Sequence, residues 1–424
     1  MNKLLETIAV DLTPILPGGE NGGAKIFVIE LLRGLAKMAP QTQFVLLTQA
    51  ASHEELKILD SPNMRRYLAV GSAETNNIRP NMPGKASLAQ RFSPARFIRV
   101  FKRWVRRFIA ALKYRGSNAI MRDIGADLLF CPFTALTYYK AGIPTVCTIY
   151  DLQYKIYPEF FTAENVYQRD RAFINACHRA TVLAAISDYS RDSAIAHGNI
   201  DPARIRTIYL RMAQRTSPEA KQDTNVLNRL GLTPQSYLIY PANFWQHKNH
   251  EMLLTAFGMA CHEGFSADIK LVCTGAPGAR QDWLMSSART MNLSEKVIFP
   301  GFLPNEELAA LMVNCRGVVF PSLYEGFGLP VIEAMAAGVP VASSNTTSLP
   351  EVAEDAAILF DPRIPTQIAK AMASLVNDDA LCARLIQSGK QRVAEFSDSE
   401  RMTREYWDIF QFAMIKNKAM RMWR

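Results

Sequence analysis

The chain has 424 residues, of which 49% are hydrophobic and 21% charged, and its formal net charge is +9. This composition excludes a disordered or fibrous protein, and no run of about 18 uncharged apolar residues marks a membrane-spanning helix. One hydrophobic core rarely serves so long a chain, so we expect two domains of roughly 200 residues each.

The N-terminal apolar stretches are too short for the core of a signal peptide, so we expect no export. The seven cysteines are scattered, and none has C-x-x-C spacing. We therefore expect buried free thiols rather than disulfides or zinc ligands.

Short apolar runs alternate with stretches of helical periodicity, which is the pattern of parallel sheets crossed by helices. In the first half we expect strands at Thr7–Val10, Gln43–Leu47, Asp127–Phe130, Pro144–Ile149, Thr181–Ile186 and Ile205–Tyr209, and helices at Ala24–Met38, Glu164–His178 and Asp188–Ala196. Ser187 gives the last of these helices a capping signal.

The composition turns polar between Arg211 and Asn225, as in a connection between domains. Beyond it we expect strands at Tyr237–Tyr240, Ile269–Thr274, Lys296–Phe299, Val318–Phe320, Pro340–Ala342 and Ala357–Phe360, and helices at His250–Cys261, Gln281–Met291, Glu306–Val313 and Pro330–Ala337. The predicted fold is α/β, with two doubly wound Rossmann-like domains (1–215 and 216–399) facing each other across a cleft. A C-terminal helix at about 400–424 can pack back on the first domain.

The segment after Phe320 has the most specific chemistry. A turn leads into Glu325-Gly326-Phe327-Gly328-Leu329 and then into a helix that Pro330 can begin. Proline at the first helical position loses no hydrogen bond, and the free N–H groups of the first turn point back toward the glycines. Glycine lets the backbone approach a ligand closely, and the helix dipole attracts an anion. The segment therefore predicts a site for a diphosphate or a sugar.

Two carboxylates bracket this turn. Glu325 precedes the helix and Glu333 is placed in its first turn, with seven residues between them. Carboxylates only accept hydrogen bonds, so we predict that Glu325 holds the hydroxyls of the transferred sugar and Glu333 those of the ribose. Alternatively, Glu333 only complements the helix dipole.

The string EGFGLPVIEAMAAGVPV, followed by SLPEV and LFDP, resembles the retaining GT-B glycosyltransferases of family 4. The similarity is densest over about residues 237–395 and weaker in the first half. The resemblance implies a nucleotide-sugar donor held mainly by the second domain, an acceptor held by the first, and neither a divalent metal nor another cofactor.

Matching the family pattern position by position implies a catalytic set and a donor site. The catalytic set is Glu325, Asp151 and Lys248, with Lys248 neutralising the diphosphate leaving group. The donor-binding residues are Gly22, Gly23, Asn243, Lys248, Gly301, Phe302, Leu303, Gly326, Phe327, Gly328, Leu329 and Glu333. Taken singly, the first two glycines are also typical of a flexible turn, and Lys248 of a solvated surface residue.

Two positions depart from the family pattern. Asn243 stands where many members have an arginine, so the leaving-group clamp is either weaker or completed by another cation, Arg280 or Arg211. Tyr150 precedes Asp151 where members often have His-Asp. Tyrosine cannot replace histidine as an acid or base near neutral pH, so either the family's histidine works through its backbone or the acceptor end differs here.

The stretch between Glu74 and Asp123 has no acidic residue. Phe97, Phe101, Trp104 and Phe108 recur there at helical spacing and form an apolar stripe, which is surrounded by the cations Arg99, Lys102, Arg103, Arg106 and Arg107. This pattern is typical of an interfacial helix on anionic lipid, and it predicts peripheral binding at the inner face of the cytoplasmic membrane. The alternatives are a cationic helix packed on the first domain and a nucleic-acid surface, although no nucleic-acid motif accompanies the charge.

The strings DLTPILPGGENGGAK and YPANFWQHKNHE resemble bacterial mannosyltransferases of surface-polysaccharide (O-antigen type) biosynthesis. The resemblance implies transfer of mannose from GDP-mannose to a lipid-linked oligosaccharide. We expect front-face substitution, because no carboxylate has a clear claim to be a nucleophile. A UDP-sugar donor, a sugar-nucleotide epimerase and a non-catalytic nucleotide-sugar-binding membrane-surface protein are the alternatives.

Overall fold

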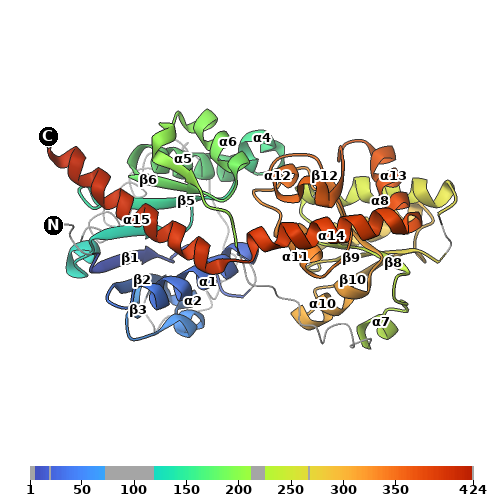
Figure 1. The fold of residues 1–424 in the computed structure, drawn as a ribbon, viewed down its shortest axis with the longest axis horizontal. Coiled ribbons are helices and arrows are strands. Elements are labelled where there is room, and N and C mark those ends of the chain that lie inside the picture. Colours follow the sequence, from blue (N-terminus) through green and yellow to red (C-terminus); the bar gives the residue numbers. More distant parts are fainter. Residues whose placement is uncertain (1–4, 19–20, 72–118, 212–224, 266–267, 423–424) are drawn as a thin grey trace, which may run out of the picture. The chain divides into compact units, whose positions relative to one another are not determined.

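The structure is a computed structural model that describes residues 5–18, 21–71, 119–211, 225–265 and 268–422 (Figure 1). The predicted membrane-surface stretch and nearly all of the polar connection lie outside these residues. Within them, no helix is both long and apolar enough to cross a membrane. The chain divides into two compact units: residues 1–148, 171–184 and 403–424 form the first, and residues 149–170 and 185–402 form the second.

The first sheet has seven strands in the order β3 (Met64–Val70), β2 (Gln43–Gln49), β1 (Thr7–Asp11), β4 (Leu128–Cys131), β5 (Thr145–Ile149), β6 (Val182–Ala185) and β7 (Ile205–Thr207). β1 runs parallel to both neighbours, with Ile8 opposite Phe44 on one side and Leu128 on the other. The helices between these strands along the chain are α1 (Gly22–Met38), α2 (Ala50–His53), α4 (Gln153–Ile156), α5 (Ala163–Arg179) and α6 (Asp188–Gly198). Short 3-10 turns lie at Glu55–Leu59 (η1), Pro158–Phe160 (η2) and Pro202–Arg204 (η3).

The second sheet has six strands in the order β10 (Val297–Gly301), β9 (Lys270–Thr274), β8 (Tyr237–Pro241), β11 (Gly317–Phe320), β12 (Val341–Ser344) and β13 (Ala357–Phe360). Every pair in it is parallel. Its helices are α7 (Asn225–Arg229), α8 (His250–His262), α9 (Ala279–Thr290), α10 (Asn305–Asn314), α11 (Leu329–Ala336), α12 (Leu349–Ala353), α13 (Pro365–Asn377) and α14 (Asp379–Phe396), with 3-10 turns at Gln246–Lys248 (η5) and Glu354–Ala356 (η6). The last helix of the chain is α15 (Ser399–Met422).

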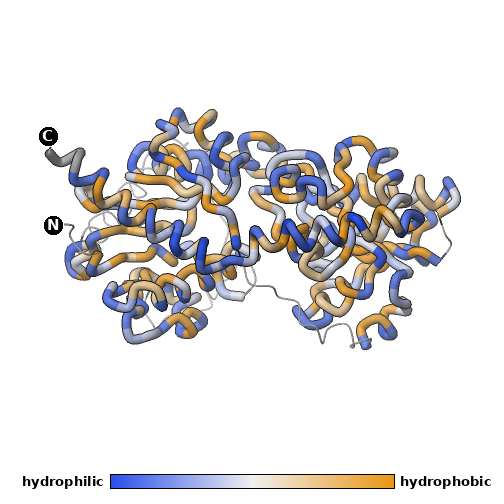
Figure 2. The backbone as a smooth tube through the Cα atoms, viewed as in Figure 1, coloured by the Kyte–Doolittle hydropathy of each residue, from blue (hydrophilic) through white to orange (hydrophobic). Residues whose placement is uncertain are grey.

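The strands of both sheets consist largely of hydrophobic residues, as Figure 2 shows by the hydropathy along the backbone, and most of these residues are buried. In the first unit, Tyr406 and Phe410 of α15 pack on the Phe130 ring at 5.6 and 5.0 Å between centroids. In the second unit, α14 packs on α11, where Gly389 lies against Met335.

The predicted strands are all present with small shifts at their ends, and two parallel α/β sheets are confirmed. Ser187 caps α6 as predicted, since its hydroxyl oxygen accepts from the Ser190 N–H. All seven cysteines are free and all but Cys261 are buried. The strand β3 was not predicted from the sequence, because this edge strand has mostly half-exposed side chains and two adjacent arginines. The boundary near residue 215 falls outside the described residues and stays a prediction.

Candidate functional site

The site predicted after Phe320 lies at the carboxyl edge of the second sheet, where β8, β11 and β12 are neighbours. Parallel strands end at one edge, so the loops that follow them converge. Lys248 follows β8, Glu325 follows β11, and the Lys248 Nζ atom lies 2.7 Å from the Glu325 Oε1 atom. Each of these side chains is only 12% exposed. Lys248 is therefore part of a largely enclosed ion pair and not a solvated surface residue.

Polar contacts fix the backbone that carries Lys248. The Tyr240 hydroxyl lies 2.9 Å from both the Lys248 carbonyl and the Ser322 hydroxyl. The Asn249 side-chain amide donates to the carbonyls of Pro321 and Pro362, which follow β11 and β13. The loops after three strands are thus joined around the ion pair.

Serine hydroxyls hold the loop from Glu325 to Gly328. The Gly326 carbonyl accepts from the Ser187 and Ser190 hydroxyls at 2.7 and 3.2 Å. The Ser348 hydroxyl contacts the Glu325 and Phe327 carbonyls at 3.0 and 2.9 Å. All three consecutive carbonyls are therefore engaged by the protein.

From Gly326 onward, the backbone amide groups of the same loop have no acceptor in the part of the chain that the structure describes. Among the described residues, none accepts a hydrogen bond from the backbone N–H of Gly326, Phe327, Gly328 or Leu329. Gly328 adopts a left-handed conformation with φ of 111° as the N-cap of α11. The Phe327 side chain is buried against Tyr209 and Phe396, so only its backbone is available to a ligand. Unpaired N–H groups at a helix N-terminus attract an anion or a polar oxygen.

The placement of Glu333 in the first turn of the helix is wrong. α11 begins at Leu329, so Pro330 is its second residue and Glu333 its fifth, and the first turn has no acidic residue. The dipole effect fades beyond the first turn, so the interpretation of Glu333 as a simple dipole partner loses its basis. Its predicted contact with a ribose stays a prediction.

Asp151 belongs to the same electrostatic neighbourhood. Burial raises the pKa of its carboxyl, the charge of Glu325 raises it further, and Arg169 and Lys248 oppose the rise. The backbone just before it is pressed against the glycine loop, because a Cβ atom on Gly326 would lie 2.4 Å from the Tyr150 carbonyl oxygen. Tyr150 thus contacts the loop through its backbone, and both alternatives for this departure from the family pattern stay predictions.

The two cations considered as substitutes for the family's arginine lie in different surroundings. Arg280 forms an ion pair with Glu251, and its charge adds to burial and to the charge of Lys248 in lowering the pKa of His250. The Arg211 guanidinium donates to the Glu395 carbonyl on α14. Arg280 is therefore the cation that shares the neighbourhood of Lys248.

Asn243 itself has a structural contact. Its side-chain oxygen accepts from the Ala276 N–H at 2.9 Å. This hydrogen bond ties the loop after β8 to the loop after β9, and its predicted contact with the donor stays a prediction.

Two histidines beside Lys248 were not predicted from the sequence. Burial lowers the pKa of His250 to about 3 and that of His247 to about 4, so both rings are neutral at pH 7. His250 packs between Tyr240 and Phe244 at 4.7 and 4.9 Å between ring centroids. Within the described residues neither of its ring nitrogens has a hydrogen-bond partner. Because the rings of His247 and His250 are neutral, Lys248 is the charged side chain of η5 and the residues next to it.

The segment predicted to lie along a nucleotide base ends β10. Gly301 is the last residue of the strand and has φ of 81°. Phe302 is 72% exposed, whereas Leu303 is 8% exposed and anchors the turn. An exposed aromatic ring beside a buried anchor is a suitable surface for stacking a planar ligand.

Gly22 and Gly23 lie in the first unit and begin α1, where Gly22 has φ of 52°. The Lys25 ammonium donates to the Gly18 carbonyl and pairs with Glu55 of η1. The phosphate contact predicted for the two glycines stays a prediction.

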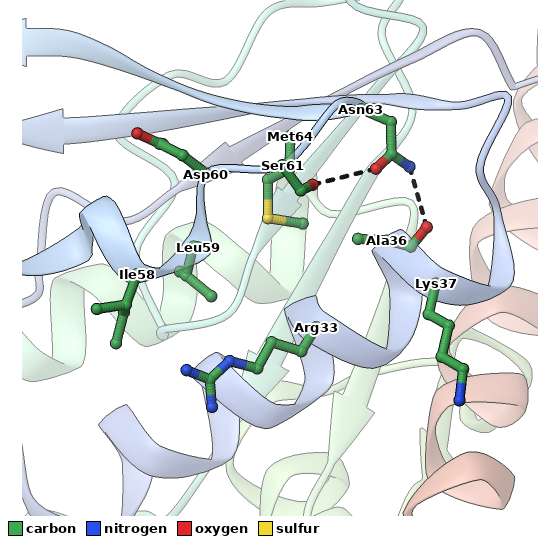
Figure 3. A pocket seen from close by; sticks show the side chains of 9 residues that line it. All are labelled: Arg33, Ala36, Lys37, Ile58, Leu59, Asp60, Ser61, Asn63 and Met64. Atoms are coloured by element: carbon green, nitrogen blue, oxygen red, sulfur yellow. Dashed lines mark hydrogen bonds between the residues drawn. The ribbon is translucent and has the colours of Figure 1, made fainter.

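A cavity of about 300 Å³ lies elsewhere in the first unit, between α1, η1 and β3 (Figure 3). Asn63 lines it, and its side-chain amide donates to the carbonyl of Ala36 on α1. None of the predicted site residues lines it.

In the part of the chain that is described, no three His, Cys, Asp or Glu side chains converge as a metal ion would need. Metal independence stays a prediction.

Lys248, Glu325 and the glycine loop lie in a segment of the chain that matches a known family model. Residues 227–392 match the family model described as Glycosyl transferases group 1. The chain is 30% identical over 253 residues to the O-antigen chain mannosyltransferase B of Escherichia coli, a match that covers 59% of this chain and 66% of that protein. It is 28% identical over 275 residues to the serotype-specific mannosyltransferase WbdA of Escherichia coli, covering 61% of this chain and 33% of that protein.

Solved structures extend the similarity to the whole fold. Anabaena Alr3699/HepE in complex with UDP and glucose has a TM-score of 0.69 at 17% identity, covering 96% of this chain and 99% of that one. WaaG, a glycosyltransferase involved in lipopolysaccharide biosynthesis, has a TM-score of 0.62 at 14% identity, covering 95% of this chain and 99% of that one. The two Rossmann-like domains of the GT-B type are thereby confirmed.

Proposed function

We propose, on the premise that residues 227–392 form a glycosyl transferases group 1 domain, that the protein is a retaining, metal-independent glycosyltransferase of family 4. Its donor is GDP-mannose and its acceptor a lipid-linked oligosaccharide of bacterial surface-polysaccharide biosynthesis. The observation that carries this proposal is the row of backbone N–H groups from Gly326 to Leu329, which have no acceptor among the described residues and lie next to the Lys248–Glu325 pair.

The roles follow from charge and from hydrogen-bonding capacity. Lys248 and the free N–H groups of the loop bind the negatively charged diphosphate, which gains charge as its bond to the sugar breaks. Glu325 can only accept hydrogen bonds, so it binds sugar hydroxyls. The ion pair keeps both groups preorganised before the donor arrives, and the lysine is then shared between Glu325 and the phosphate.

In the reaction we propose, the bond between the anomeric carbon and the phosphate oxygen breaks and a bond to the acceptor oxygen forms on the same face. The proton of the acceptor hydroxyl passes to the departing phosphate oxygen. The protein contributes positioning and charge stabilisation, and no covalent enzyme intermediate forms. Asp151 lies in the electrostatic neighbourhood of Glu325 and Lys248, where it can orient the incoming acceptor hydroxyl.

The choice of mannose is supported by the two Escherichia coli relatives, both mannosyltransferases by name. A ligand that binds only the folded state stabilises it by RT ln(1 + L/Kd), where L is the ligand concentration, so at equal concentration the tighter ligand raises the melting temperature more. We expect GDP-mannose to stabilise the protein more than UDP-glucose, UDP-galactose or GDP-fucose at equal concentration. Stabilisation by UDP-sugars alone would reject the GDP-mannose assignment, but it would not contradict the proposal that the protein is a glycosyltransferase.

Transfer itself is tested with radiolabelled nucleotide sugar and membranes carrying lipid-linked acceptor. We expect label in the lipid fraction with the wild-type chain and none with Glu325→Ala. Activity should persist in EDTA, and NMR of the product should show the anomeric configuration of the donor. Donor binding without turnover under all conditions would favour the non-catalytic alternative suggested by Asn243 and Tyr150.

We propose that the basic stretch brings the enzyme to the lipid-linked acceptor at the inner face of the cytoplasmic membrane. Its composition supports this, because cationic residues next to aromatic ones bind anionic lipid surfaces. Replacing Arg99, Lys102, Arg103 and Arg106 by glutamate should abolish co-sedimentation with phosphatidylglycerol vesicles. Transfer to a soluble acceptor analogue should remain. Unchanged vesicle binding would locate the membrane contact elsewhere.

A further inference from the structure

Two hydroxyl groups at the start of α6 meet at one carbonyl of the glycine loop. Ser187 is the N-cap of α6 and Ser190 follows in its first turn. Their hydroxyls lie 2.7 and 3.2 Å from the Gly326 carbonyl oxygen. Ser190 is also 2.8 Å from the Tyr150 carbonyl, so it bridges the loop and the segment that leads to Asp151.

The direction of a carbonyl fixes the direction of the next amide. A trans peptide is planar, so the N–H of Phe327 points away from the Gly326 carbonyl that the two serines hold. In the same way, the contacts of Ser348 with the Glu325 and Phe327 carbonyls orient the N–H groups of Gly326 and Gly328. The serine hydroxyls thus hold the N–H groups of Gly326, Phe327 and Gly328 in the directions opposite to the carbonyls that they contact.

Packing leaves this arrangement little freedom. A side chain at position 326 would collide with the Tyr150 carbonyl, and one at position 328 would lie 2.6 Å from Leu349. The N-terminus of α6 is itself held, since the Glu351 carboxylate on α12 accepts from the Tyr189 N–H at 3.2 Å. Ser348 immediately precedes α12. The hydrogen bond between Tyr189 and Glu351 therefore links the helix of Ser187 and Ser190 to the helix that follows Ser348.

We propose that Ser187 and Ser190 are positioning residues for the donor site. Their hydroxyls fix the Gly326–Phe327 peptide so that its N–H is aimed at the transferred sugar and its diphosphate. This inference rests on the proposed function and adds to it the groups that set the geometry of the loop. Neither serine touches the donor; both act through the Gly326 carbonyl.

The test compares Ser187→Ala, Ser190→Ala and the double variant with the wild-type chain in donor turnover. Removing an interaction that the donor makes only in the transition state lowers kcat. We expect each single change to lower kcat about tenfold and the double change about a hundredfold, since a hydrogen bond of ordinary strength corresponds to roughly one decade of rate. The Kd of the nucleotide diphosphate alone should change less than about twofold, because the phosphate keeps Lys248 and the remaining amides.

Two further variants separate positioning from simple stability. Ser187→Thr keeps both the hydroxyl and the helix cap, so its kcat should stay close to that of the wild-type chain, in contrast to Ser187→Ala. Ser193→Ala, on the same helix, removes a hydroxyl that lies against His197 and should behave as wild type. Melting temperatures are recorded for every variant, and if Ser187→Ala fails to fold, Ser190→Ala and Ser187→Thr still give the comparison.

Wild-type kcat in both single variants would overturn this inference and leave the proposed function standing. A loss of activity that follows the melting temperature and is not rescued by threonine would also overturn it. A wild-type chain that neither binds nor transfers any nucleotide sugar would overturn the proposed function and this inference together.

Discussion

The Nζ atom of Lys248 lies 2.7 Å from the Oε1 atom of Glu325, with both side chains largely enclosed. A pair in this position is coupled, because removing one partner leaves the other charge poorly solvated and unpaired. The two residues assigned to opposite ends of the donor, phosphate and sugar, therefore depend on each other before any ligand binds.

We predict that Lys248→Met lowers kcat by about a hundredfold to a thousandfold, the range seen when one preorganised electrostatic group is removed. It should also destabilise the fold by about 3 kcal/mol, because Glu325 remains unpaired. Donor turnover and urea unfolding measure the two effects.

The double variant Lys248→Met/Glu325→Gln is the matched control for stability. It removes both charges, so it should recover most of the unfolding free energy that Lys248→Met removes, while remaining inactive. A double variant as unstable as Lys248→Met would show that packing of the lysine stem, and not its charge, stabilises this loop.

A second prediction concerns Gly326. Alanine there would bring its Cβ atom to 2.4 Å from the backbone oxygen of Tyr150, which cannot rotate away. We expect Gly326→Ala to displace the loop and abolish turnover, as measured in the same donor assay.

Gly258→Ala is the control for this substitution. Gly258 lies within α8, where an added Cβ would meet Leu293 at an ordinary 3.6 Å. Because alanine is the better helix former, this variant should be as active as wild type and more stable by about 0.5–1 kcal/mol. Equal activity of the two alanine variants would refute the close approach at Gly326.

The glycine loop and its helix could be predicted well because their signals are local. A strand, a turn with glycines and a proline-led helix occur in one continuous string, so Glu325 and Gly328 could be placed without any tertiary information. The error at Glu333 is also local, because a helix boundary carries an uncertainty of one or two residues.

Contacts between distant segments could not be predicted from the sequence. Ser187 has the pattern of a helix cap and Ser190 that of an ordinary helical residue, yet 136 or more positions separate them from Gly326. Lys248 and Glu325 are 77 positions apart, and only the parallel neighbours β8 and β11 bring their loops together. No periodicity or spacing encodes such pairs in a single sequence.

The exposed ring of Phe302 gives a third prediction. Phe302→Ala should change the unfolding free energy by less than about 0.5 kcal/mol, because the side chain is mostly in solvent. If the ring stacks on the nucleotide base, the same change should raise the Kd of the free nucleotide about tenfold, within the range of an aromatic stacking contact. Calorimetric titration measures the Kd.

Trp283→Ala serves as the matched control, since this ring on α9 is 52% exposed and was not predicted to contact the donor. It should leave nucleotide affinity unchanged. If both variants bind the nucleotide as wild type does, the base does not lie along residues 301–303.

The last prediction concerns Asp11, which ends β1 and is 1% exposed. Its Oδ1 atom accepts from the N–H and the hydroxyl of Thr13 at 3.1 and 2.6 Å. Burial raises the pKa of this carboxyl from 3.8 to about 6, against the opposing effect of hydrogen bonds from Thr13 and Thr137. The folded state therefore binds the proton more tightly than the unfolded state does.

The sign of the pH dependence follows from this raised pKa. Between pH 4 and 6 the folded chain holds more protons than the unfolded chain, so stability falls as pH rises through this window. A shift of about two pKa units corresponds to about 3 kcal/mol. Asp11→Asn cannot titrate and escapes this loss, so its unfolding free energy relative to wild type should improve by about 3 kcal/mol from about pH 4 to about pH 7. Urea unfolding of both proteins across this range measures the difference, in which the titration of all other groups cancels. A difference that stays constant with pH would mean that Asp11 keeps an ordinary pKa in the folded chain.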